Sequence, residues 1–191
     1  MPRSLRGHLL IAGRRLRDTN FFRSVVLMVE HNAEGAMGVV LNQPTEITVS
    51  SALESVTEMP EMPETGELVY LGGPVERQAL FIVHNAADLQ SNDNEILDGV
   101  YLGAGPDDFE TIVRRVAMGE APLRYRMFFG CAGWGPRQLE GELKRNDWMV
   151  LPARSEHIFP DDPYTLWDHV AAEYQKLHPP VKGIPTDPRW N

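Results

Sequence analysis

The sequence predicts an α+β domain in which helices pack around a mixed, largely antiparallel sheet. Two apolar runs rich in β-branched residues, Val25–Val29 and Met37–Leu41, flank the polar, glycine-bearing segment His31–Gly35. Two such runs around a short turn indicate a buried antiparallel hairpin. Other strand-like and helix-like segments interleave irregularly along the chain, which favours a mixed sheet with helices around it.

The first half of the chain is expected to contain mostly short strands around this hairpin. The apolar segment Leu9–Ala12 is expected to pack early against the core. After the hairpin, the capping box Ser51-x-x-Glu54 predicts a short helix over Ser51–Val56. The acidic segment Thr57–Gly66 holds two prolines and is expected to be a loop. Short apolar runs predict two further strands, Leu68–Leu71 and Ala79–His84.

The second half mixes strands with helices. The polar segment Asn85–Asp98 is expected to be irregular. A second capping box, Asp107-x-x-Glu110, predicts a helix that ends at Gly119. Residues at helical spacing give this helix one apolar face: Phe109, Ile112, Val113 and Val116. Further strands are expected at Val100–Leu102, Leu123–Phe129 and Asp147–Leu151.

Two more helices are expected near the end of the chain. The glycine-rich segment Gly130–Pro136 is expected to turn into one of them, with Pro136 at the first helical position. The last helix is expected to begin at Asp162-Pro163 and to stop at Pro179-Pro180. Its apolar stripe consists of Tyr164, Trp167, Val170, Tyr174 and Leu177, and the three aromatic residues of the stripe are expected to lie in the core.

Length and composition indicate one domain. The chain has 191 residues, of which 42% are hydrophobic, as in an ordinary globular protein. We expect a single domain over residues 1–178 and a proline-rich tail over residues 179–191. The one cysteine, Cys131, excludes an internal disulfide and a cysteine-based zinc site. No apolar run reaches the ~18 residues of a membrane span, so a cytoplasmic protein without membrane contact is expected.

The charge disfavours direct binding of nucleic acid. The formal net charge is −9, from 18 basic and 27 acidic residues, whereas affinity for nucleic acid comes largely from basic residues that neutralise phosphates. Six arginines gather near the start of the chain: Arg3, Arg6, Arg14, Arg15, Arg17 and Arg23. They form either one basic face or, as charge runs usually do, a solvated edge.

Polar side chains stand at the ends of both hairpin strands. Because residues that flank a turn face each other, Glu30, His31 and Asn42 are expected to converge at one end of the hairpin. A carboxylate beside an imidazole can carry acid–base chemistry when both are buried. The alternative is a hydrogen-bonded turn in which these side chains satisfy backbone groups. A metal there would need further ligands from elsewhere in the chain.

A pair of glycines, Gly72 and Gly73, follows a predicted strand and precedes Pro74. Glycines in this position can let a phosphate approach the backbone. No Walker-type lysine follows, and the proline removes one N–H donor. A tight structural turn is therefore the competing interpretation.

A second glycine-rich segment contains Cys131 and Trp134. Where glycines lead into a helix, free N–H groups and the positive end of the helix dipole come together. Trp134 could then line the floor of a pocket and Gln138 could hydrogen-bond a ligand; alternatively, the glycines allow close packing and Trp134 fills the core. A helix start can activate a cysteine, but no base for Cys131 is identifiable, and a buried inert thiol is the alternative.

Three ordered motifs resemble one known family. They are LLIAGRRLRDTNFFRSVVLMVEHNAEGAMGVVLNQP (Leu9–Pro44), YLGGPV (Tyr70–Val75) and GCAGWGPRQLEGEL (Gly130–Leu143). Together they resemble the YqgE/AlgH family of bacterial proteins, over nearly the whole domain. The resemblance implies an α+β fold with a bifurcated, barrel-like mixed sheet. It implies no settled activity: members are called candidate transcriptional regulators, without a family-wide mechanism.

The function expected from these features is binding rather than catalysis. The sequence offers no complete catalytic constellation, which favours a non-enzymatic protein that binds a small ligand or another protein and regulates indirectly. No cofactor and no metal are expected. The alternative is a hydrolase that uses Glu30 and His31, or Cys131. The candidate ligand-binding residues are Glu30, His31, Asn42, Gly72, Gly73, Cys131, Trp134 and Gln138.

Overall fold

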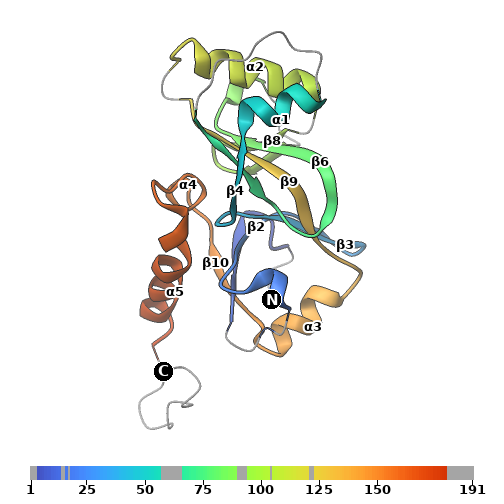
Figure 1. Cartoon of the computed structure of the whole chain (residues 1–191). Coiled ribbons are helices and arrows are strands. Elements are labelled where there is room, and N and C mark those ends of the chain that lie inside the picture. Colours follow the sequence, from blue (N-terminus) through green and yellow to red (C-terminus); the bar gives the residue numbers. More distant parts are fainter. Residues whose placement is uncertain are drawn as a thin grey trace.

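The computed structural model describes residues 4–13, 16, 18–56, 66–89, 94–103, 105–120 and 123–179. Within them, strands and helices alternate irregularly (Figure 1). The strands are β1 (His8–Ala12), β2 (Val25–Asn32), β3 (Gly35–Val40), β4 (Pro44–Thr48), β5 (Leu68–Leu71), β6 (Val75–His84), β7 (Glu95–Leu97), β8 (Val100–Gly103), β9 (Tyr125–Trp134) and β10 (Trp148–Pro152). The helices are α1 (Val49–Val56), α2 (Pro106–Ala117), α3 (Gln138–Lys144), α4 (Ser155–Ile158) and α5 (Leu166–Leu177), with 3₁₀ turns η1 (Thr19–Phe21), η2 (Ala87–Leu89) and η4 (Pro163–Thr165).

The strands form one mixed sheet. Its order is β10-β1-β2-β3-β9-β6-β8-β7, and the β4–β5 pair joins it through β9. The paired strands are antiparallel except for β5 and β9, which run parallel. Figure 1 shows β6, β8, α1 and α2 in one part of the molecule and β2, β3, β10 and α3 in the other, with β9 running between them. The predicted α+β class and mixed sheet are confirmed.

The predicted hairpin and the other predicted strands are also confirmed. β2 pairs with β3 from Val26 opposite Val40 to Asn32 opposite Gly35, with a bulge between Met28 and Glu30. The predicted apolar segment near the N-terminus is β1, and the remaining predicted strands correspond to β5, β6, β8, β9 and β10. The prediction that Asn85–Asp98 is irregular is wrong in part, because this segment contains η2 and the strand β7, which pairs with β8.

The sheet divides at Gly130 in β9. Tyr125–Phe129 pair with β6, whereas Gly133 lies opposite Met37 of β3. Gly130 has φ +66°, a conformation that L side chains rarely adopt. A Cβ here would come within 2.8 Å of the Gly73 carbonyl oxygen. The backbone of β9 therefore crosses the glycine turn after β5 in close contact, and only glycine fits at the crossing.

The glycine-rich segment after Phe129 is strand and not the predicted turn. β9 continues to Trp134, which is buried and pairs with Ala36 of β3. Helix α3 consequently begins at Gln138, after Arg137 in a left-handed conformation (φ +64°). The prediction that Pro136 occupies the first helical position is therefore wrong, because pairing with β3 holds this segment extended.

Helix α1 begins at Val49, two residues before the predicted start at Ser51. The Thr48 hydroxyl oxygen accepts a hydrogen bond from the Ser51 backbone N–H at 3.3 Å. Threonine and serine are both favoured as N-cap residues. Because β4 ends at Thr48, the helix starts directly after it, with Thr48 rather than Ser51 as the N-cap. The predicted capping box is wrong for this reason.

Helix α2 begins at Pro106, one residue before the predicted Asp107. The backbone N–H of Gly105 donates to Oδ2 of Asp108 at 3.3 Å, so Asp108 and not Glu110 reaches back to the helix start. The predicted end of this helix is confirmed, because α2 closes at Ala117 and Gly119 follows with φ +74°.

The predicted start of the last helix at Asp162-Pro163 is the start of the 3₁₀ turn η4, and α5 itself begins at Leu166. Oδ1 of Asp162 accepts the backbone N–H of Tyr164 at 2.9 Å and caps η4, which precedes α5. Val170 is buried, whereas Tyr164 is 73% exposed and Leu177 is 61% exposed. The prediction that Tyr164 lies in the core is wrong, because Tyr164 belongs to the 3₁₀ turn, and Leu177 is exposed as the last helical residue.

Consecutive residues of β9 face two different apolar clusters, as successive side chains of a strand do. Met127 belongs to the cluster that includes Leu53 of α1 and Ile112 of α2. Phe128 belongs to the cluster that includes Ile158 of α4 and Val170 of α5. The helices are thus held on opposite faces of the strand at which the sheet divides.

Some predictions lie outside the described residues. They concern the loop at residues 57–65, the tail at residues 180–191, and Arg3, Arg14, Arg15 and Arg17. In the parts of the chain that are described, no helix has both the length and the apolar character needed to cross a membrane.

Candidate functional site

A cleft of about 420 Å³ lies between the start of β9, the β4–β5 pair and the segment that joins α4 to η4. Figure 1 shows α4 beside β4 in this region. Three charged residues, Glu67, Arg124 and Arg126, line the cleft, and the rest of the lining is aromatic, aliphatic or proline. A mostly apolar cleft with a few polar groups is the usual form of a small-molecule site.

The most unusual group in the cleft is Arg126, a half-buried arginine in a central strand. Nη2 donates a hydrogen bond to the carbonyl oxygen of Pro160 at 2.9 Å, and Nη1 donates to that of Leu41 at 3.3 Å. The guanidinium carbon lies 4.5 Å from the centre of the Tyr70 ring. Burial lowers the pKa of Arg126, and the nearby Tyr70 hydroxyl and Glu67 carboxyl groups oppose this effect. Arginine nevertheless stays protonated in proteins, so the cleft contains a fixed cation.

A carboxyl group, Glu67, shares the cleft with this cation. The residue as a whole is exposed, but desolvation of its carboxyl group raises its pKa. A hydrogen bond from Tyr125 and the charge of Arg126 act in the opposite direction. Glu67 is the one acidic residue of the lining.

Three tyrosines form much of the aromatic surface. Tyr70 is 8% exposed and packs against the Phe128 ring, with 5.8 Å between the ring centres. Burial raises the pKa of Tyr70, while the nearby Arg126 cation lowers it. Tyr125 is buried and Tyr164 is exposed at the opening. The buried Tyr70 and Tyr125 therefore form the inner wall of the cleft, and the exposed Tyr164 lies at its opening.

The predicted cluster of Glu30, His31 and Asn42 does not form. Asn42 lies at the far end of the hairpin, where its Oδ1 accepts the backbone N–H of Val25 at 2.9 Å. The expectation overlooked that Asn42 follows the end of β3, whereas Glu30 lies near the turn. Glu30 is exposed, and its Oε1 accepts a hydrogen bond from Asn32 at 2.7 Å.

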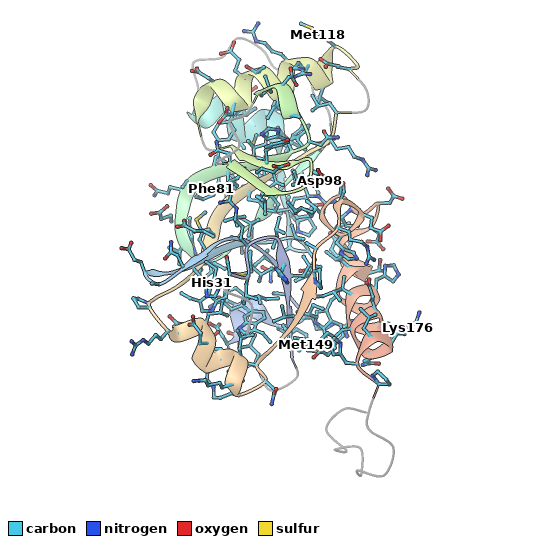
Figure 2. All side chains as sticks on the ribbon, turned by 180° about the vertical axis from the view of Figure 1, so that it is seen from behind. His31, Phe81, Asp98, Met118, Met149 and Lys176 are labelled. Carbon is cyan, nitrogen blue, oxygen red and sulfur yellow. The ribbon has the colours of Figure 1, made fainter. Side chains whose placement is uncertain are left out.

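Both ring nitrogens of His31 are occupied. Nδ1 accepts the backbone N–H of Leu5 at 3.0 Å, and Nε2 lies 3.2 Å from Oε1 of Glu140 in α3. Figure 2 shows His31 on the hairpin, close to α3. With Nδ1 accepting, the ring proton sits on Nε2 and points to Glu140. His31 joins the N-terminal segment to α3, as the hydrogen-bonded alternative predicted.

The two glycine segments meet each other. A Cβ on Gly72 would overlap the carbonyl oxygen of Gly130, and a Cβ on Gly73 would overlap the backbone of Cys131. The backbone N–H of Gly72 donates to the carbonyl of Phe129 at 2.8 Å. The geometry matches the tight structural turn rather than an approach for phosphate.

Cys131 lies in the apolar core and is 4% exposed. Burial raises the pKa of its thiol, which opposes formation of the reactive thiolate. Cys131 is in strand and not at a helix start, so the proposed activation by α3 has no basis. The geometry matches the inert alternative.

Trp134 and Gln138 belong to a network centred on Glu142 of α3. The indole N–H groups of Trp134 and Trp148 both donate to Oε2 of Glu142 at 2.8 Å. Gln138 donates to Oε1 of Glu142 at 3.0 Å and accepts the backbone N–H of Gly135 at 3.1 Å. The network docks α3 on the sheet and engages the side chains that were expected to reach a ligand.

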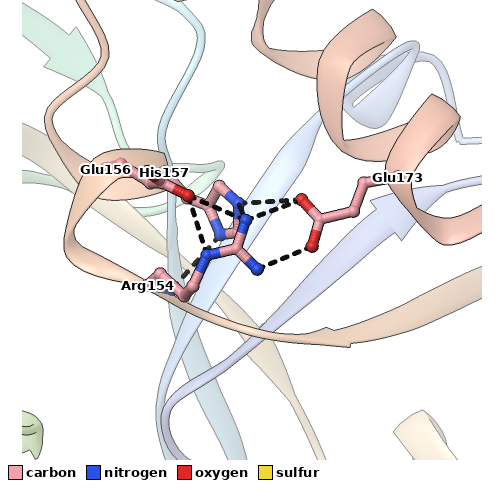
Figure 3. A network of polar contacts seen from close by, with 4 residues as sticks. All are labelled: Arg154, Glu156, His157 and Glu173. Carbon is pink, nitrogen blue, oxygen red and sulfur yellow. Dashed lines mark hydrogen bonds and ion pairs between the residues drawn. The ribbon is translucent and has the colours of Figure 1, made fainter. Parts of the chain in front are cut away.

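A second polar network joins α4 to α5 (Figure 3). Arg154 donates to both carboxylate oxygens of Glu173, at 2.7 and 2.9 Å, and to Glu156 at 2.8 Å. His157 Nδ1 accepts the backbone N–H of Arg154, and its Nε2 lies 3.2 Å from Glu173. Burial lowers the pKa of His157, and the Arg154 charge adds to this effect. This network fixes α5 against the turn that carries one wall of the cleft.

Sequence reasoning did not single out Arg126, although a signal was present. In LRYRMFF, Arg124 and Arg126 alternate with Leu123 and Tyr125. A period of two places Arg126 on the same face as Phe128, which is fully buried. Arginine is rarely buried unless it is paired, so this pattern marks Arg126 as a functional candidate. Within the described ranges, no group of three or more potential metal ligands is found.

One family model matches nearly the whole chain. A family model described as AlgH-like matches residues 9–177. Among curated relatives, the UPF0301 protein Smlt1098 of Stenotrophomonas maltophilia is 40% identical over 162 residues, which cover 83% of this chain and 82% of that protein. A UPF0301 protein of Nitrosococcus oceani is 37% identical over 169 residues, which cover 87% of this chain and 88% of that protein.

Two solved structures resemble this fold. The solution structure of the AlgH protein from Pseudomonas aeruginosa gives a TM-score of 0.74 at 30% identity, covering 94% of this chain and 95% of that one. The crystal structure of protein DIP2367 from Corynebacterium diphtheriae gives a TM-score of 0.68 at 26% identity, covering 87% of this chain and 85% of that one.

Proposed function

The chain belongs to the AlgH-like family, and on that premise we propose that it is a non-enzymatic binding module with an indirect regulatory role. The Arg126 cleft is the site at which it binds. The observation that carries this proposal is the position of Arg126, a fixed cation in a cleft of about 420 Å³. The regulatory output is argued from the family resemblance and from the construction of the cleft.

The construction of the cleft supports a regulatory output. Its walls come from β4, β5, β9 and the α4–η4 segment, which are far apart in the sequence. Arg126 also donates a hydrogen bond to the carbonyl oxygen of Pro160, in the segment between α4 and η4. A bound molecule would touch the same segment and so change how α4 and α5 sit against the sheet. A partner protein could recognise the changed position of α4 and α5 without any chemical reaction taking place.

The hydrolase alternative has less support. His31 has both ring nitrogens occupied, and Cys131 is buried in the core. In the part of the chain that the structure describes, no hydrogen bond or ion pair joins Cys131 to His31 or Glu30. None of these three residues lines the cleft. A nucleophile, its base and a substrate pocket would have to be close together.

Complementation tests the proposal. The gene is deleted in its host bacterium, transcripts are profiled, and the strain is complemented with wild type, Arg126→Gln, Leu68→Glu or Arg77→Gln. Leu68 is a partly exposed cleft residue, 37% accessible, and Arg77 is an exposed arginine of β6 outside the cleft. We expect Arg77→Gln to restore the wild-type profile and the two folded cleft variants to fail. Full restoration by both cleft variants would refute the cleft as the functional site.

A further inference from the structure

We propose that the ligand of the Arg126 cleft is a small monocarboxylate with an apolar body. Its carboxylate pairs with Arg126, and its apolar part packs against Leu68, Leu123 and Phe159. This inference rests on the proposed binding role of the cleft and adds the chemical class of the ligand.

The first argument is the charge of Arg126, which the protein holds without a direct ion pair, although the Glu67 carboxyl group shares the cleft and attracts it. The partners of its guanidinium are two carbonyl oxygens and the face of Tyr70. No carboxylate lies within ion-pairing distance of Arg126 among the described residues. A guanidinium has five N–H donors in a planar fork, which matches the two oxygens of a carboxylate. Because an unneutralised cation is costly away from water, an oxyanion in the cleft offsets that cost.

The second argument concerns the number of negative charges on the ligand. Of the charged residues in the lining, Arg124 and Arg126 are cations and Glu67 is an anion, which leaves one net positive charge. One carboxylate balances that charge. A phosphate monoester carries about −1.5 to −2 near neutral pH, so its second charge would meet the repulsion of Glu67 without a partner of its own.

The third argument is the apolar surface beside the cation. Leu68, Val116, Leu123, Phe159 and Pro163 all line the cleft. Leu68 is 37% exposed although it lies on a strand beside the core. Covering such surface contributes about 25 cal/mol per Å². The ligand is therefore expected to carry a hydrocarbon or aromatic group of the size that a cleft of about 420 Å³ accepts.

Calorimetric titration tests the inference with three probes that share one apolar body: phenylbutyrate, phenylbutanol and phenylbutyl phosphate. We expect the acid to bind wild type about tenfold or more tightly than the alcohol, since a charge-assisted pair replaces a neutral contact. We also expect the acid to bind more tightly than the phosphate. Arg77→Gln is expected to match wild type, and Arg126→Gln, once shown to be folded by circular dichroism, to lose the preference for the acid.

A second pair of variants leaves Arg126 untouched. Leu68→Glu and Leu68→Lys remove the same apolar side chain and introduce opposite charges. We expect the acid to bind Leu68→Lys more tightly than Leu68→Glu, and the alcohol to bind both equally.

The outcomes separate this inference from the proposed function. Equal binding of acid and alcohol, tighter binding of the phosphate, or no binding of the acid to wild type would each overturn the monocarboxylate. If the Arg126 and Leu68 variants still failed to complement in that case, the cleft would remain the functional site with another ligand. If they complemented fully, the proposed function would fall as well.

Discussion

The guanidinium carbon of Arg126 lies 4.5 Å from the centre of the Tyr70 ring. The two residues come from β9 and β5, which pair in parallel, with Tyr70 opposite Phe128. The ring face and two carbonyl oxygens hold the cation in place without neutralising its charge. A cation that is fixed before the ligand arrives is preorganised for an oxyanion, which lowers the cost of binding.

Removing the acidic residue of the cleft is expected to strengthen anion binding. Glu67→Gln keeps the size of the side chain and removes a negative charge from the lining, so the affinity for phenylbutyrate should rise by about threefold or more. The gain for phenylbutyl phosphate should be larger, because it carries more charge. Titration calorimetry measures both, and weaker binding of the acid to Glu67→Gln would contradict the charge argument.

Glu142 is expected to be essential for docking α3. Glu142→Ala leaves the indole N–H groups of two buried tryptophans, Trp134 and Trp148, without their acceptor. Unsatisfied buried donors cost about 1–3 kcal/mol each, so urea unfolding should show a loss of about 2–6 kcal/mol for the two donors, with a red shift of tryptophan fluorescence. As a control, Glu110→Ala removes an exposed ion pair with Arg114 and should cost about 0.5 kcal/mol or less. Equal losses in the two variants would contradict the role of the network.

Buried His84 is expected to make stability depend on pH. Desolvation lowers the pKa of His84 from 6.5 to about 4, against the charge of Asp108. Nδ1 accepts the backbone N–H of Ala86 at 3.2 Å, and Nε2 has no hydrogen-bond partner among the described residues. A lowered pKa favours the neutral ring in the folded state. The contribution of the neutral His84 ring to the free energy of unfolding is therefore complete above pH 6.5. It is lost as the pH falls toward 4, and the loss is on the order of 3 kcal/mol.

The variant His84→Asn isolates this effect, since the asparagine oxygen can still accept from Ala86. Urea unfolding at a series of pH values should show a smaller loss of stability below pH 6.5 in the variant than in wild type. Besides Asp108, the charged groups near the imidazole are Arg115 and Asp88, and both are unchanged in the variant. Parallel curves for the two proteins would show that His84 does not titrate in this range.

The crossing at Gly130 is expected to tolerate no side chain. Gly130 and Gly99 have similar φ values, +66° and +69°, but a Cβ on Gly99 meets nothing within 4 Å, whereas one on Gly130 comes 2.7 Å from the Val75 carbonyl oxygen. Gly99→Ala should therefore cost about 1 kcal/mol for the left-handed conformation alone. Gly130→Ala should cost at least about 2 kcal/mol more, because the backbone must move. Thermal unfolding compares them, and equal losses would contradict the close crossing.

The strands that are continuous apolar runs could be predicted from the sequence, as in the hairpin from Val25 to Leu41. The strands β4 and β7 were missed, because neither is such a run. The start of α3 could not, because Gly130–Gly135 carries turn residues while the partner that keeps it extended, β3, is distant in the sequence. The helix starts at Thr48 and Gly105 were missed for a related reason: several N-cap residues stand close together, and the preceding strand or turn selects one of them.

The site was harder to predict than the fold. Polar residues at turns and strand ends, such as His31 and Asn42, were predicted to bind a ligand but hydrogen-bond to backbone groups of the chain instead. Arg126 lies inside an apolar strand, and its significance depends on Tyr70 and Pro160, which only the folded chain brings to it. Alternation of arginine with apolar residues in one strand was the available signal.

The most direct test is to observe the Nε–Hε resonance of Arg126 by NMR while phenylbutyrate is added. Arg126→Gln assigns the resonance, and Arg77 provides an arginine outside the cleft as an internal reference. We predict a saturable shift of the Arg126 resonance, with contacts from the phenyl ring to Leu68 and Leu123, while the Arg77 resonance stays in place. An unchanged Arg126 resonance at saturating acid would contradict the cleft as a carboxylate site.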